Sequence, residues 1–122
     1  MNRQLKQMPL WRDANRLLLL IEDAVRQFPR YHKYTLGSDL RRQAMNICRL
    51  IARAVHDREG RAQHLKRLVF TIDDVKVLIQ LGKELKAFQN FKSFQIAAEL
   101  AVDLGRQSGG WQRRLRPEVS NR

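Results

Sequence analysis

The strongest pattern in the chain is a heptad seam in its last quarter. Apolar or small residues recur there at alternating steps of three and four positions, at Phe94, Ala97, Ala101, Leu104, Ser108, Trp111 and Leu115. This spacing places a continuous stripe along one side of a helix that packs against other helices. The pattern therefore predicts a long helix that begins at Asn90 or Ser93.

Three earlier segments have the same periodicity. It predicts helices over residues 9–28, from residue 35 or 38 to about residue 57, and over residues 61–88. Pro29 ends the first helix, Thr35 or Ser38 can cap the second, and Gly60 marks the turn before the third. The positions predicted to face the core are Leu10, Ala14, Leu17, Ile21, Val25 and Phe28, then Leu36, Leu40, Ala44, Ile47, Ile51 and Ala54, then Leu65, Leu68, Ile72, Val75, Ile79, Gly82 and Leu85.

The connections between these helices are short, so neighbouring helices should run antiparallel. The sequence thus predicts an all-α protein with the architecture of an antiparallel up-down-up-down four-helix bundle. We expect a single domain over residues 1–122, with its core at about residues 9–115 and flexible ends at residues 1–7 and 117–122.

The first helix is apolar over more than one face. Apolar residues run without interruption from residue 17 to residue 21, which is more than a turn of about 3.6 residues. A bundle helix buries one stripe, so Leu19 and Leu20 should have apolar surface left over, and such surface is typical of an interface. We expect a homo-oligomer that uses Leu19 and Leu20, unless the ends of the chain cover them. The run is too short to span a membrane.

Charge adds a second feature, because 24 Lys and Arg residues face only 12 Asp and Glu residues and give a net charge of +12. The excess is uneven: residues 1–67 carry 15 bases and 6 acids, whereas residues 68–104 carry 4 bases and 5 acids. Such a balance is typical of a protein that contacts a polyanion, most often RNA or DNA. The alternative is a basic face that is only solvated.

Two basic stripes are the candidate nucleic-acid contacts. The second predicted helix carries Arg42, Asn46, Arg49, Arg53 and His56 on one face, and the first contributes Arg12, Arg16, Arg26 and Arg30. Guanidinium groups match phosphate oxygens in a bidentate way. Tyr31 and Tyr34 lie among basic residues, where they either stack on unpaired bases or pack against the end of the bundle.

Signals of catalysis are weak. The single Cys48 excludes an intrachain disulfide and fits a reducing cytoplasm, and the three histidines lack metal-ligand spacing. We therefore expect no metal, no cofactor and no catalytic residue. One alternative stays open: Arg49 and His56 loosely resemble the Arg-x4–6-His motif of the helical HEPN ribonucleases.

Short motifs also carry a family resemblance. Phe28-Pro29-Arg30, Tyr34-Thr35-Leu36-Gly37 and Ala52-x-Ala54 resemble the four-helix proteins encoded by intervening sequences of bacterial ribosomal RNA genes. The ending Gly105-Arg106-x-x-Gly109-Gly110-Trp111 is more similar to a sister branch, the accessory variability determinant (Avd) of diversity-generating retroelements.

The Avd resemblance implies a non-enzymatic bundle that assembles into a ring of five subunits. It also implies binding to a reverse transcriptase and to template RNA or cDNA, in a bacterial or phage-encoded system. An rRNA-associated structural protein is the alternative from the same wider group. That branch commonly has a Gly after the Ala-x-Ala segment, where this chain has Val55-His56-Asp57.

Overall fold

The computed structural model describes the backbone of residues 3–120 and the side chains of residues 3–115. Its helices are α1 (Arg3–Gln7), α2 (Pro9–Arg26), α3 (Arg30–Lys33), α4 (Leu36–His56), α5 (Arg61–Glu84) and α6 (Phe91–Ser120). The prediction of an all-α protein is confirmed, because this part of the chain forms helices and no strand.

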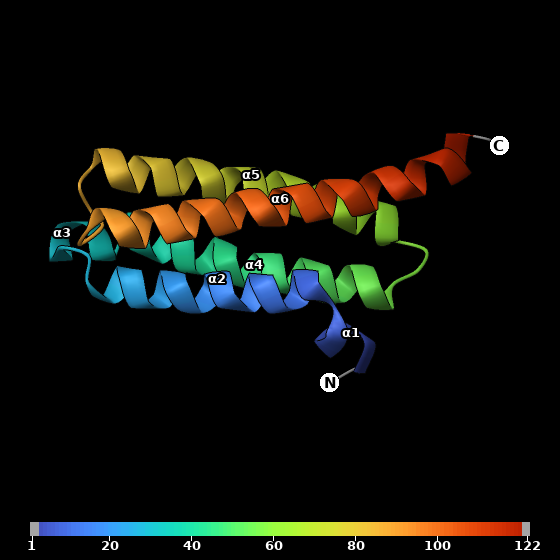
Figure 1. Ribbon diagram of the computed structural model, residues 1–122, viewed down its shortest axis with the longest axis horizontal. Coiled ribbons are helices and arrows are strands. Elements are labelled where there is room, and N and C mark those ends of the chain that lie inside the picture. The colour runs from blue at the N-terminus through green and yellow to red at the C-terminus, as the bar shows by residue number, and fades with distance from the viewer. Residues whose placement is uncertain (1–2, 121–122) are drawn as a thin grey trace.

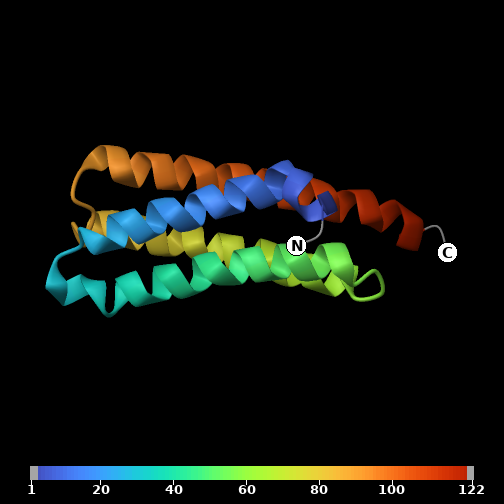
Figure 2. The same cartoon turned by 90° about the horizontal axis from the view of Figure 1, so that it is seen from below.

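The four long helices lie side by side, and the chain reverses direction from each one to the next (Figure 1). Helix α4 contacts both α2 and α5, and α6 contacts the same two helices from the other side. Helices α2 and α5 therefore occupy opposite corners of the bundle. Helix α1 lies at the end of the bundle where α2 begins, and it contacts α2 (Figure 2).

The core consists of the predicted seams. Every predicted inward position of α2 and α4, together with Phe28, is buried, and so are those of α5 as far as Gly82. On α6 the seam is buried from Phe94 to Ser108, whereas Trp111 and Leu115 are half-buried and pack against the core. The prediction was wrong for Leu85, which is half exposed because α5 ends at Glu84 and Leu85 follows it.

The helix ends differ in how they are capped. Asn90 Oδ1 accepts a hydrogen bond from the backbone N–H of Ser93 at 2.8 Å and so caps α6. Thr35 is the N-cap residue of α4, but its hydroxyl donates to the carbonyl of His32 instead of accepting from the helix. Part of the predicted linker, Arg30–Lys33, forms the short helix α3.

The N-terminal segment is more ordered than the sequence indicated. Residues 3–7 form α1, and its Leu5 is buried in the core. At the other end α6 continues to Ser120, so four residues of the predicted flexible end, 117–120, are helical. Residues 1–2 and 121–122 of the predicted flexible ends lie outside the described residues.

Most ion pairs of the described residues join positions three apart on the same helix, such as Arg42 with Asp39 and Arg106 with Asp103. One pair links two helices, between Arg41 Nε of α4 and Glu22 Oε1 of α2 at 2.7 Å. In the part of the chain that the structure describes, no helix is long and apolar enough to cross a membrane.

Ser108 is a polar residue in the core. It is fully buried, and among the described residues its hydroxyl has no hydrogen-bond partner. Because an unsatisfied buried hydroxyl costs free energy, we expect Ser108→Ala to raise the free energy of unfolding by about 1 kcal/mol. Urea denaturation followed by circular dichroism measures the change. Ser93→Ala is the control, because Ser93 lies at a half-buried position and its hydroxyl has a hydrogen-bond partner in Asn90. A loss of stability in Ser108→Ala would contradict the prediction.

Candidate nucleic-acid interface

A groove between α4 and α5 gathers several of the predicted basic residues. It has a volume of about 310 Å³ and is lined by Asn46, Arg49, Leu50 and Arg53 of α4 and by Arg67, Phe70 and Thr71 of α5. The α4 residues recur every three or four positions, so they share one face of that helix. The α5 residues face them because the two helices pack against each other.

The arginines of this groove carry uncompensated charge. Arg49, Arg53 and Arg67 are exposed, and within the described part of the chain none of them forms an ion pair. Phe70 lies beside them with 70% of its surface exposed. The guanidinium groups offer partners for phosphates, and the exposed ring of Phe70 offers a surface for base stacking. This combination suits a nucleic acid strand.

The two outer members of the α4 stripe have other surroundings. Arg42 Nη1 bonds Asp39 Oδ1 at 2.8 Å, so its charge is partly compensated. His56 is exposed and lines a second hollow at the end of α4, together with Arg53, Asp57 and His64. The positive charge of the predicted α4 stripe is therefore least compensated by carboxylates between Arg49 and Arg53.

The turn after α4 is held by hydrogen bonds to Asp57. The backbone N–H of Gly60 donates to its Oδ1 at 3.0 Å, and His64 Nε2 lies 2.9 Å from its Oδ2. The Gly60 bond, and after it the His64 bond, hold the pKa of Asp57 below its usual value. Arg61 also donates to the carbonyls of Ala54 and Val55, which closes the end of α4.

The second predicted stripe, on α2, does not reach the groove. Its residues Arg12, Arg16 and Arg26 are exposed, but α2 lies at the opposite corner of the bundle from α5. Arg16 and Arg26 lie 3.9 and 3.4 Å from Asp13 and Asp23 of the same helix. Arg30 is exposed at the start of α3. The structure thus separates the predicted basic residues into two surfaces.

The tyrosines beside this second surface project into solvent. Tyr31 and Tyr34 are both exposed, and Tyr31 meets only the edge of His32 among the ring contacts of the described residues. Of the two readings that the sequence left open, packing against the end of the bundle is therefore not supported. The rings are accessible to a partner.

Two groove residues, Arg67 and Phe70, were not predicted from the sequence. The sequence did contain a signal for this surface. Phe70 is an aromatic residue outside the α5 seam, where a bundle helix normally has a polar residue, and Arg67 precedes it by three positions. Their relation to Arg49 and Arg53 depends on how α5 packs against α4, and a periodicity within one helix does not contain that information.

The two residues of the ribonuclease motif line neighbouring hollows that share Arg53. Arg49 lines the α4–α5 groove, whereas His56 lines the hollow at the end of α4. The nearby His64 has its Nδ1 buried and its Nε2 at 2.9 Å from Asp57 Oδ2. Among the described residues no cluster of His, Cys, Asp or Glu could hold a metal ion. Burial also raises the pKa of the Cys48 thiol to about 11, so Cys48 is a poor nucleophile.

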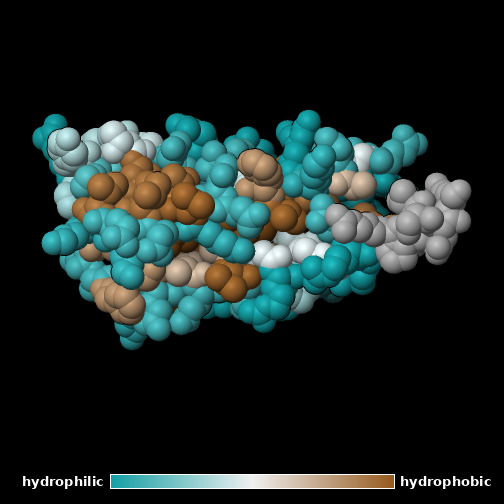
Figure 3. Space-filling model, turned by 90° about the horizontal axis from the view of Figure 1, so that it is seen from above, coloured by the Kyte–Doolittle hydropathy of each residue, from teal (hydrophilic) through white to brown (hydrophobic). Residues whose placement is uncertain are grey.

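Apolar residues outside the core form two exposed surfaces. Leu19 on α2 is 64% exposed, as the sequence predicted, whereas Leu20 is half-buried against the core. A larger surface lies at the end of α5, where Val77 and Leu81 of the helix and Leu85 directly after it are 57%, 46% and 50% exposed. Figure 3 shows hydrophobic residues gathered on this side of the molecule, towards the end where α5 stops. We call these three residues the α5 apolar face.

These features define a class: a basic all-helical bundle with an uncompensated arginine groove and exposed apolar helix faces. A model of the bAvd-like family matches residues 10–115 of the chain. The chain belongs to this family of accessory variability determinants, which confirms the resemblance carried by the Gly105–Trp111 motif. A search of curated proteins found no match.

Proposed function

We propose that this protein is a non-enzymatic accessory subunit of a diversity-generating retroelement that binds nucleic acid in the α4–α5 groove. The observation that carries the proposal is the group of three exposed, unpaired arginines, Arg49, Arg53 and Arg67, around the ring of Phe70. In this role it holds template RNA or cDNA while a reverse transcriptase copies the template. Family membership supports the accessory role.

Arginine contacts to phosphates release counterions, so the proposal is tested by measuring binding at several salt concentrations. In a filter-binding titration with single-stranded RNA and DNA, the affinity should fall steeply as salt rises. An affinity that does not respond to salt would contradict binding by this groove.

We also propose that the protein forms a homo-oligomer through two different faces. One is the surface of α2 around Leu19, and the other is the α5 apolar face. Because α2 and α5 occupy opposite corners of the bundle, the two faces of one copy point away from each other. Contact between two different faces joins the copies head to tail. Such a contact produces a ring when the rotation from each copy to the next brings the last copy back to the first. The family resemblance suggests five subunits.

The charges around these faces are complementary. Arg12, Arg16 and Arg26 share the face of α2 that carries Leu19, at helical spacing. Asp73, Asp74 and Glu84 lie beside Val77 and Leu81 on α5 in the same way. Arg16, Arg26 and Asp73 already pair within their own helices, with Asp13, Asp23 and Lys76. Among the described residues, Arg12 on α2 and Asp74 and Glu84 on α5 form no ion pair, so these opposite charges are left to select the partner and its orientation.

This arrangement gives the arginines of α2 a second possible partner besides phosphate, namely the acidic residues of α5 in the neighbouring copy. Phe70 of the groove lies seven residues, about two helical turns, before Val77 on the same face of α5, so the groove borders this contact. We propose that the reverse transcriptase binds the assembled oligomer, and co-purification of the two proteins tests that contact.

A further inference from the structure

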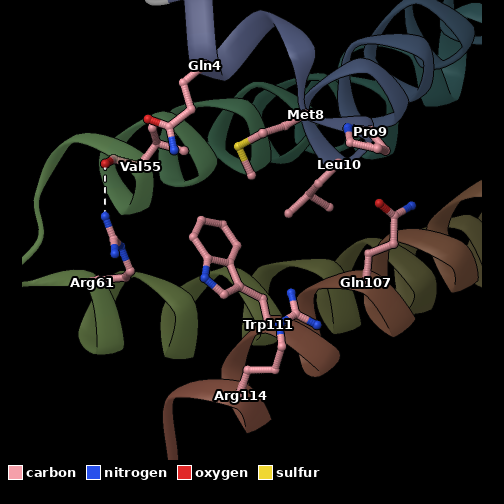
Figure 4. A pocket seen from close by; sticks show the side chains of 9 residues that line it. All are labelled: Gln4, Met8, Pro9, Leu10, Val55, Arg61, Gln107, Trp111 and Arg114. Carbon is pink, nitrogen blue, oxygen red and sulfur yellow. Dashed lines mark hydrogen bonds between the residues drawn. The ribbon is translucent and has the colours of Figure 1, made fainter.

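A cavity at the end of the bundle lies outside the groove described above. It has a volume of about 500 Å³ and is lined by residues of α1, the start of α2, the end of α4, the start of α5 and α6. Met8, Leu10 and Val55 supply apolar walls, and Trp111 projects between them (Figure 4). This volume is in the range of pockets that hold small organic ligands.

Part of the Trp111 ring is accessible to a ligand inside this cavity. Its side chain is half-buried, so one part packs against the core while another part lines the open space. A tryptophan ring is a large flat surface on which any nucleic acid base can stack. The cavity therefore fits a planar, largely apolar group.

The polar residues of the cavity favour an anionic ligand. Arg61 and Arg114 line it, and among the side chains that the structure describes no carboxylate does. Arg61 is held in place by its bonds to the carbonyls of Ala54 and Val55. Arg114 is exposed and has no ion pair within the described part of the chain. A guanidinium without a partner beside a flat apolar surface matches a nucleotide, which combines a base with a phosphate.

The glycines next to Trp111 are a separate observation. A Cβ added at Gly109 or Gly110 would meet only the side chains of Arg113 and Arg114 of the same helix, whereas one at Gly105 would meet Lys76 of α5. Packing within the chain thus does not require glycine at 109 or 110, although each costs about 1 kcal/mol of helix stability relative to alanine. Neither glycine lines the cavity, because neighbouring positions on a helix point about 100° apart, so the α6 side of the site consists of Gln107, Trp111 and Arg114.

We infer that this cavity binds one unpaired nucleotide of a nucleic acid strand, with its base on the indole of Trp111 and its phosphate at Arg114. The inference rests on the proposed function, since it adds a second base-binding site to a protein whose groove combines arginines with the exposed ring of Phe70. It would let the protein distinguish an unpaired strand from a duplex, because paired bases are not available to stack.

The test compares two single-stranded DNA probes of the same length and charge, a deoxyadenosine decanucleotide and an abasic decamer that has phosphates but no bases. The chain has two tryptophans, so a Trp11→Phe variant leaves Trp111 as the only one. We expect the decanucleotide to quench the fluorescence of Trp111 and the abasic probe to bind without quenching it. Equal quenching by both probes would overturn the inference.

Trp111→Leu keeps an apolar side chain but removes the stacking surface. We expect it to lower the affinity for the decanucleotide about tenfold and the affinity for the abasic probe less than twofold. An unchanged affinity for the decanucleotide would overturn the inference, and the fluorescence experiment decides should Trp111→Leu not fold. If the wild type binds neither probe, the proposed function fails as well. If it binds both equally without quenching, only the cavity assignment fails.

Discussion

Replacement of Arg49, Arg53 and Arg67 by glutamate should lower the affinity for single-stranded RNA or DNA by about tenfold to a hundredfold. Each lost phosphate contact is worth about 0.5–1 kcal/mol, a tenfold change corresponds to about 1.4 kcal/mol, and the new carboxylates repel the strand. The side chains are exposed, so the fold should persist. A filter-binding titration at low and at physiological salt measures the loss, which should be larger at low salt.

A matched variant separates the location of the charges from the net charge. Lys6→Glu, Lys86→Glu and Lys92→Glu together change the net charge by the same amount at exposed positions outside the α4–α5 groove that form no ion pair among the described residues. This control should lose much less affinity than the groove variant. Equal losses in the two variants would mean that total charge, rather than the groove, determines binding.

Val77→Asp combined with Leu81→Asp should convert the proposed oligomer into a monomer of 14.4 kDa. Both positions are about half exposed, so carboxylates there should leave the single bundle folded while they place charge in an apolar contact beside Asp73 and Asp74. Sedimentation velocity at micromolar concentration measures the mass. Val102→Asp, at an equally exposed apolar position of α6, is the control and should leave the oligomer intact.

The head-to-tail arrangement makes a sharper test possible. Leu19→Asp should also give a monomer, because it damages the opposite face. A mixture of Leu19→Asp with the Val77→Asp, Leu81→Asp variant retains one intact pair of faces, so it should form dimers and nothing larger. A wild type that is monomeric, or a mixture that stays monomeric, would rule out contact between these two faces.

The helices could be predicted from the sequence because burial in a bundle repeats along each helix. The seam from Phe94 to Ser108 contains this repeat within a single helix. Helix α1 could not be predicted in this way, since it is five residues long and buries only Leu5. Thr35 fits the composition rule for a cap, but its hydroxyl bonds to His32 of the preceding helix instead.

The candidate site was only partly predictable. The face with Arg49 and Arg53 follows from spacing along one helix, whereas the contribution of Arg67 and Phe70 depends on which side of α5 meets α4. The same limit applies to Leu20, which a neighbouring helix helps to cover, in a hollow shared with Ile96 of α6. Relations between helices are determined by packing, and a single periodic pattern describes only one helix at a time.

The ion pairs have a practical consequence for work with this protein. Those of the described residues lie mostly within single helices, and Arg41 with Glu22 is the pair that joins two of them. Cohesion between the helices therefore comes from apolar packing, which concentrated salt does not weaken. Washing the protein at high ionic strength during purification should strip off co-purifying host RNA while the bundle stays intact, so that binding assays can start from a clean, folded sample.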